Sequence, residues 1–307
     1  MAHGWIILDK PLELGSTQAV SAVKRNLREA GFTTGRKGGK KVKVGHGGTL
    51  DPLASGVLPI ALGEATKLTG RMLDADKTYL FTLRFGEETD TLDAEGKVIA
   101  TSEVIPSRDA ISAILPCFTG PISQIPPAYS ALKVDGQRAY SLARAGETVE
   151  LAARDVTIHA LEIHGFDEAD GVTLMASVTK GTYIRSLARD IAHALGSCGT
   201  VTMLRRIKAG PFDLSQAISL DKLNEIGKGA PLEQILLPLE AGLDDIPAIV
   251  LDPEQARAVR QGRVLAGLHL DDGLHWAREN DIPVALVEIS GGDARVVRGF
   301  NLTDVAE

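Results

Sequence analysis

The sequence has few cysteines, no metal-binding histidine pattern and no long hydrophobic run. Its two cysteines, Cys117 and Cys198, are far apart, so we expect neither a disulfide framework nor a cysteine-based zinc site. The seven histidines form no HxxxH or HxxEH pair, and we expect no bound metal. No apolar run approaches the ~18 residues that a membrane span requires, and the N-terminus lacks the cationic flank and cleavage site of a signal peptide. These absences predict a cytoplasmic protein that does not enter a membrane.

The sequence also lacks an excess of positive charge. Its net charge is −7, whereas contacts to nucleic-acid phosphates require Lys and Arg. Net charge is only a sum, however, and binding depends on the local potential. The basic residues cluster in two runs, 36–43 and 205–208. Each run is typical of a solvated loop, but an acidic protein with a basic face is the open alternative.

Hydrophobic residues make up 44% of the 307 residues, which is ordinary for a globular protein of about two domains. Apolar periodicity predicts strands at 6–8, 79–85 and 172–178, and a helix over 184–195. A further helix is predicted from an N-cap at Ser16 to a stop at Gly31. The stretch 44–69 reads as irregular, apart from a short apolar run at 57–62. This mixture, without strict alternation, favours an α+β fold.

The composition changes between residues 227 and 245, and this change places a domain boundary near 240–247. We therefore predict a domain over residues 1–245 and a small, β-rich domain over 246–307. Asp252, Pro253 and Gln255 form a cap, an N1 proline and a capping box, which predict a helix start in the second domain. Strands are predicted at 284–289 and 295–297.

The most informative stretch is residues 45–67, GHGGTLDPLASGVLPIALGEATK. Its glycines before Asp51 allow tight turns and the close approach of a ligand. They do not form a phosphate-binding loop, because the GxxxxGK[ST] spacing is missing. The residues alone therefore indicate only a carboxylate held in a glycine-lined loop, and an Asp-Pro pair is often no more than a turn.

This string resembles the signature segment of the B-type tRNA pseudouridine synthases. Further blocks that agree in order and spacing are KTY at 77–79, TDTLDAEG at 89–96, QIPPAYSALK at 124–133, KGTYIR at 180–185 and LRR at 204–206. The resemblance covers residues ~5–215. It implies a mixed, mainly antiparallel sheet flanked by helices, a thumb-like insertion at about 122–152, and, more loosely, a small PUA-like RNA-binding domain at the C-terminus. The loop 35–43 is longer and more basic than the usual family connection.

The resemblance implies an isomerase that converts uridine to pseudouridine with Asp51 as the catalytic residue. The base must leave C1′, turn and be reattached through C5. The carboxylate could attack C1′, attack C6 of uracil, or remove a sugar proton to give a glycal, and the sequence does not choose between these routes. The reaction is redox-neutral, so no cofactor is expected.

The resemblance also assigns roles to other residues. Arg185 corresponds to the arginine that pairs with the catalytic carboxylate, and such a partner would offset the unfavourable position of a cation in the first turn of a helix. Tyr79 matches the active-site tyrosine that stacks on the target base. His46 matches the histidine that fills the space left by the flipped nucleotide. The remaining matches are Asp93, Lys67 and Leu204 lining the pocket, and Lys133 and Arg138 as phosphate contacts in the thumb-like insertion.

The preferred interpretation is a stand-alone, monomeric enzyme that acts on the T-arm stem-loop of tRNA, at position 55, without an obligate protein partner. One alternative is the same chemistry inside a guide-RNA particle. Another is a non-catalytic RNA-binding or RNA-folding protein, against which the retained Asp51, Tyr79 and Arg185 argue. An unrelated phosphate-binding enzyme is disfavoured by the missing lysine–hydroxyl pair and metal ligands.

Overall fold

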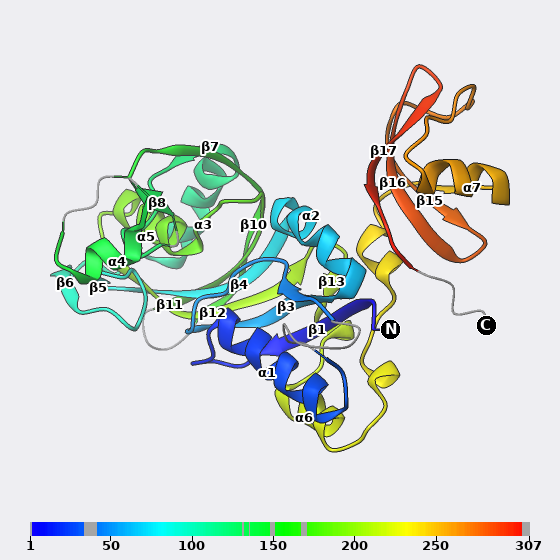
Figure 1. The fold of residues 1–307 in the computed structure, drawn as a ribbon. Helices are drawn as coiled ribbons and strands as arrows, with labels where there is room; N and C mark the ends of the chain where they lie inside the picture. Colours follow the sequence, from blue (N-terminus) through cyan, green and yellow to red (C-terminus); the bar gives the residue numbers. More distant parts are fainter. Residues whose placement is uncertain are drawn as a thin grey trace.

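A computed structural model of the chain describes residues 2–33, 42–130, 132–134, 136–147, 151–166 and 171–302. A nine-stranded sheet dominates it, in the order β1-β3-β12-β4-β11-β10-β7, with β2 paired to β3 and β13 paired to β12 (Figure 1). Its strands are β1 (Gly4–Lys10), β2 (Val44–His46), β3 (Ala54–Leu62), β4 (Lys77–Phe85), β7 (Gly120–Gln124), β10 (Arg154–Phe166), β11 (Gly171–Val178), β12 (Gly199–Ala209) and β13 (Phe212–Asp213). Only β3 and β12 run parallel within this sheet; its other described pairs are antiparallel. The predicted α+β class and mainly antiparallel sheet are therefore confirmed.

Helices cover the sheet because their apolar faces match its buried side chains. Helices α1 (Ser16–Glu29) and α6 (Leu220–Gly227) lie side by side and enclose one core with β1 and β3 (Figure 1). Helix α5 (Ile184–Ala194) and α3 (Arg108–Ile114) enclose a second core with β4, β10 and β11. Further helical elements are α2 (Thr69–Asp74) and the 3-10 turns η1 (Gly63–Leu68), η2 (Leu115–Phe118), η3 (Leu214–Gln216), η4 (Leu232–Gln234) and η5 (Leu239–Leu243). Among the helices that the structure describes, none combines the length and the hydrophobicity that a membrane-spanning segment requires.

Two local predictions were wrong. Helix α1 begins at Ser16 with Gly15 as its N-cap, and the Ser16 hydroxyl bonds to Leu50 instead of capping the helix. The stretch 44–69 is not irregular, since it contains β2, the nine-residue β3 and η1. Both faces of β3 are buried, so its sequence is a nearly continuous apolar run, without the alternation that marks a half-buried strand.

Short elements project from the large sheet at two places, after β7 and after β4. The segment between β7 and β10 holds a hairpin of β8 (Lys133–Val134) and β9 (Gln137–Arg138), followed by α4 (Ala139–Arg144). A second hairpin is formed by β5 (Glu87–Thr89) and β6 (Val98–Thr101). The first residues of the predicted thumb-like insertion, 122–124, belong to β7 and pair with β10, so the chain leaves the sheet only after Gln124.

A separate four-stranded sheet follows near the C-terminus, drawn in orange and red in Figure 1. It consists of β14 (Ala248–Val250), β15 (Gly273–Glu279), β16 (Ile282–Ser290) and β17 (Asp293–Gly299), with α7 (Pro253–Arg260) packed on it. Helix α7 begins as predicted, since the Asp252 carboxylate accepts hydrogen bonds from the backbone of Glu254 and Gln255. The predicted domain boundary and the PUA-like character of this region stay predictions.

Candidate active site

Asp51 lies in the loop between β2 and β3, and side chains from distant elements fix the backbone on both sides of it. The fully buried Arg206 on β12 donates to the carbonyl oxygens of Gly48 and Thr49, both at 3.4 Å. The Ser16 hydroxyl accepts from Leu50 N–H at 2.8 Å and donates to Leu50 O at 2.9 Å. The residues before Asp51 therefore have no freedom to relax independently of β12 and α1.

The residues after Asp51 are fixed in a similar way. Pro52 O accepts from Glu13 N–H at 2.8 Å and from Lys10 Nζ at 3.3 Å. Lys10 is fully buried and also donates to the carbonyl oxygens of Pro11 and Leu14. Burial lowers the pKa of Lys10 to about 8, although the Asp51 carboxylate opposes the shift. The buried Lys10 ammonium thus links the Asp51 loop, through Pro52 O, to the turn that follows β1, through Pro11 O and Leu14 O.

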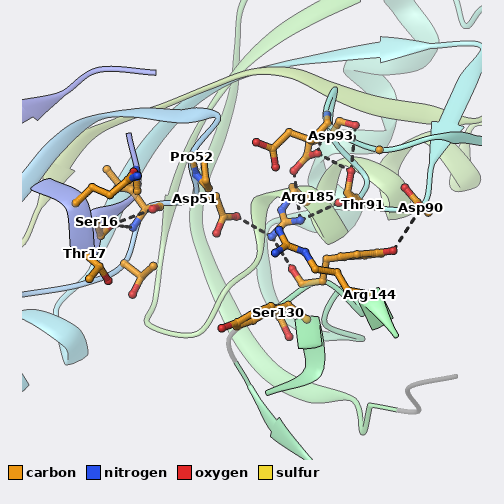
Figure 2. Close-up of a pocket in the computed structure, with 18 of the residues that line it drawn as sticks. Ser16, Thr17, Asp51, Pro52, Asp90, Thr91, Asp93, Ser130, Arg144 and Arg185 are labelled. Carbon is orange, nitrogen blue, oxygen red and sulfur yellow. Dashed lines mark hydrogen bonds and ion pairs between the residues drawn. The ribbon is translucent and has the colours of Figure 1, made fainter. Parts of the chain in front are cut away.

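Arg185 joins Asp51 to a second carboxylate. Its Nη2 lies 2.7 Å from Asp51 Oδ2, and its Nη1 lies 3.3 Å from Asp93 Oδ2. The guanidinium also donates to Thr91 O at 2.8 Å and to Tyr129 O at 3.0 Å. Figure 2 shows Arg185 between Asp51 on one side and Asp93 with Thr91 on the other. The side chain of Arg185 is 7% exposed and that of Asp51 is 45% exposed, so the arginine is immobilised while the aspartate faces solvent.

Two cavities meet at this ion pair. The larger, of about 790 Å³, is lined by Asp51, Arg185, His46 and Asp93. The smaller, of about 300 Å³, is lined by Asp51 and Arg185 together with Tyr79 and Leu204. Both volumes are large enough for a small ligand or a nucleotide. The structure therefore brings together six of the nine residues that the sequence assigned to the site.

His46 and Asp93 occupy the walls of the larger cavity. Burial lowers the pKa of His46, and its Nδ1 is buried without a hydrogen-bond partner among the described residues. A neutral imidazole is therefore favoured near neutral pH, which suits stacking better than charge pairing. Asp93 is buried, and its Oδ1 accepts hydrogen bonds from Thr91 Oγ1 at 2.6 Å and Glu95 N–H at 3.1 Å.

Tyr79 and Leu204 come from adjacent strands of the sheet. Tyr79 on β4 is half-buried and stands opposite Arg206 on β12, and Leu204 lies two residues before Arg206. Since residues two apart on a strand share a face, Tyr79, Leu204 and Arg206 lie on the same side of the sheet. That side is the floor of the smaller cavity.

Lys67 is not part of this group. Its ammonium pairs with Glu64 at 2.6 Å and donates to Gly299 O at 2.8 Å, so it contacts the end of β17, away from both cavities. The placement of Lys67 in the pocket was therefore wrong. The side chains of Lys133 and Arg138 lie outside the described part of the chain, as does most of the basic run 36–43.

The second basic run, 205–208, is not a continuous surface patch. Arg206 is 1% exposed, whereas Arg205 pairs with Asp9 at 2.7 Å. The reason is that the run lies on β12, where alternate residues face opposite sides of the sheet.

Sequence analysis missed several residues that line or support the cavities. Lys10, Lys77 and Arg206 are buried cations. Their burial could not be predicted from the sequence, because it results from the packing of other elements on both faces of their strands. The larger cavity is also lined by the residues Asp90, Tyr129 and Arg144, and the smaller by Tyr183. Tyr129 and Tyr183 stand within the blocks that carried the family resemblance, which was the available signal.

Comparison with known proteins agrees with this arrangement. Residues 36–184 match the TruB family pseudouridylate synthase N-terminal domain, and residues 185–244 match the tRNA pseudouridylate synthase B C-terminal domain. The tRNA pseudouridine synthase B of Novosphingobium aromaticivorans is 67% identical over 100% of both chains. That of Zymomonas mobilis is 60% identical over 97% of this chain and 96% of its own.

Solved structures share the fold. A chain of the Cbf5-Nop10-Gar1 complex superposes with a TM-score of 0.73 at 26% identity, covering 97% of this chain and 85% of that chain. A chain of the archaeal box H/ACA sRNP Nop10-Cbf5 complex gives a TM-score of 0.69 at 25% identity, covering 97% and 86%. From its sequence and its fold alike, this chain belongs to the TruB family of pseudouridine synthases and is a tRNA-modifying isomerase.

Proposed function

We propose that this enzyme converts the uridine at position 55, in the T-loop of tRNA, to pseudouridine, with Asp51 as the catalytic residue. The observation that carries the proposal is the Asp51–Arg185 ion pair at the junction of two cavities. The immobilised guanidinium orients the carboxylate, and the exposed Asp51 oxygen is free to meet a substrate. A carboxylate in that position suits attack at C1′, attack at C6 or removal of a sugar proton.

The larger cavity suits the RNA loop and the smaller one suits the everted nucleoside. A base in a folded loop must leave its stack before chemistry, and stacking on a side chain offsets part of that cost. The half-buried Tyr79 ring on the floor of the smaller cavity is the proposed stacking partner for the uracil, and Leu204 packs beside it. His46, on the wall of the larger cavity, fills the space that the flipped nucleotide vacates.

Asp93 acts through Arg185 rather than on the substrate. It is buried and holds the opposite side of the same guanidinium. Lys133 and Arg138, in the segment that follows β7, remain the proposed phosphate contacts.

We further propose that the enzyme works in the cytoplasm as a monomer and without an obligate protein partner. The Cbf5 chains that share its fold were solved in complexes with other proteins, so partner dependence is the specific alternative. Conversion of a bare T-arm transcript by the purified chain alone supports independent action. A requirement for added protein or guide RNA contradicts it.

The test of the proposed site is Asp51→Asn, which keeps the shape of the side chain and removes its charge. We expect the variant to form no pseudouridine in a T-arm transcript while it retains RNA binding. The matched control is Asp190→Asn, since Asp190 lies on the same helix as Arg185, pairs with Arg189 and lines neither cavity. Product formation by the Asp51 variant at the control's rate contradicts the site. Mapping the modified nucleotide anywhere other than position 55 contradicts the substrate assignment.

A further inference from the structure

The floor of the smaller cavity carries two buried cations beside Tyr79. Lys77 and Tyr79 are two residues apart on β4 and therefore share a face of the sheet. Arg206 stands opposite Tyr79 on the neighbouring β12. Lys77 is 7% exposed and Arg206 is 1% exposed, and both line the cavity. Their positions follow from strand register, so the sheet holds both charges rigidly.

Neither cation forms an ion pair anywhere in the described part of the chain. Arg206 donates to backbone oxygens only, those of Val57, Gly48 and Thr49. The Lys77 ammonium donates to Leu73 O at 2.6 Å and Ala75 O at 2.5 Å. Burying a charge without an opposite charge costs free energy. Because the protein retains two such cations, their electrostatic field can stabilise a negative charge on a ligand.

The charges around the smaller cavity are unbalanced. Its lining holds three cations and one carboxylate, that of Asp51. Arg185 is already paired with Asp51 and Asp93, so Lys77 and Arg206 carry the uncompensated positive charge. Burial lowers the pKa of Lys77 to about 8; Arg206 and Lys180 act in the same direction, whereas Asp74 and Asp76 oppose it. A lysine with that pKa is still mostly protonated at neutral pH. The smaller cavity, in which we place the neutral uracil, therefore has an excess of positive charge that would stabilise an anion.

We propose that Lys77, supported by Arg206, stabilises the negative charge that uracil acquires during the reaction. This inference rests on the proposed role of Asp51. When the C1′–N1 bond breaks, its electron pair stays on N1 and spreads onto O2 and O4 of the base. The carboxylate of Asp51 either forms a bond to C1′ or takes a sugar proton as a C1′–C2′ double bond forms. If the carboxylate instead attacks C6, the displaced pair moves onto C5 and O4 before the bond to C1′ breaks.

Each of these routes places the charge on the base. When C5 attacks C1′, the electron pair of the base becomes the new C5–C1′ bond, and Asp51 regains its charge because its bond to C1′ breaks or it returns the proton to C2′. In the C6 route the carboxylate leaves C6 as the C5 proton is lost. Loss of the C5 proton and protonation of N1 then restore the neutral base. Lys77 and Arg206 are fixed by the sheet before the charge appears, so little reorganisation is needed when it does. Arg206 also holds the Asp51 loop through Gly48 and Thr49, so its replacement would disturb that loop as well. Replacement of Lys77 tests the charge without this second effect.

The test compares Lys77→Gln with Lys77→Arg. Glutamine removes the charge but keeps an amide donor for one of the two carbonyl oxygens, whereas arginine keeps the charge. Lys222→Gln is the matched control, because Lys222 is a partly exposed residue of α6 that pairs with Glu225 and lines neither cavity. Single-turnover pseudouridine formation in full-length tRNA, the Kd for tRNA and the melting temperature are measured for each protein.

We expect Lys77→Gln to slow the single-turnover step roughly 10–100-fold, while the Kd for tRNA stays within about twofold. Lys77→Arg restores most of the rate, and the Lys222 control reacts like the unchanged enzyme. A second substrate separates electrostatics from structure. 5-Fluorouracil is a better-stabilised anion than uracil, so the deficit of Lys77→Gln should shrink when consumption of 5-fluorouridine is measured in the same tRNA.

An unchanged rate in Lys77→Gln overturns the inference. So does a deficit of equal size on both substrates, because a merely structural role would slow them alike. These failures differ from failure of the proposed function, which is the separate result that Asp51→Asn remains active.

Discussion

Ser16→Ala removes one hydroxyl group that supports the Asp51 loop. The Ser16 side chain is 4% exposed, and its oxygen makes two hydrogen bonds, to Leu50 N–H and Leu50 O, next to Asp51. Alanine leaves both backbone groups of Leu50 without these partners. A buried polar group without a partner costs about 1–3 kcal/mol, and partial relaxation reduces the sum, so we expect the free energy of unfolding to fall by about 2–3 kcal/mol.

The same change should slow catalysis, because Leu50 precedes Asp51 and a small displacement of the carboxylate weakens its alignment. We expect a fall in the single-turnover rate of roughly tenfold or more, with the Kd for tRNA little changed. Urea unfolding and rapid-quench kinetics on a T-arm transcript measure the two effects.

Ser21→Ala is the matched control. Ser21 lies on the same helix, is exposed, and donates only to Thr17 O one turn earlier. Its replacement should change the free energy of unfolding by less than about 0.5 kcal/mol. If Ser16→Ala unfolds like this control and reacts at the unchanged rate, the hydroxyl does not hold the loop and the reasoning is refuted.

Three further changes test other contacts. Gly56→Ala should lower the free energy of unfolding by several kcal/mol or prevent folding, since a Cβ at Gly56 would lie 2.1 Å from Arg206 O. Its control is Gly229→Ala, which has a similar φ but open space around it and should cost only about 1 kcal/mol in urea unfolding. Glu13→Gly should stabilise by about 0.5–1 kcal/mol, because Glu13 has a φ of 65°, and a lower melting temperature would contradict this. Lys67→Ala should leave the single-turnover rate within about twofold, and a large loss would return Lys67 to the active site.

Much of the local structure could be predicted from the sequence, because it depends on residues that are close together in the chain. The helix start at Asp252 depends on a cap, a proline and a glutamine that are adjacent in sequence, and α7 begins there. The alternation over 172–178 marked β11, and the spacing of apolar residues marked α5. Where a strand is buried on both faces, as β3 is, that periodic signal disappears, and most of the segment was read as irregular.

In the candidate site, too, some features could be predicted from the sequence and others could not. The sequence by itself determined the family, through motif blocks over most of the chain, and with it the identities of Asp51, Tyr79 and Arg185. Tertiary structure alone decided that Arg185 reaches Asp51 from 134 residues away, that Arg206 turns into the core and that Lys67 contacts β17 instead of the pocket. The physical reason is that motifs record which side chains are present, whereas strand register and the packing of α1, α5 and β12 decide which of them meet, which are buried and which charges remain unpaired.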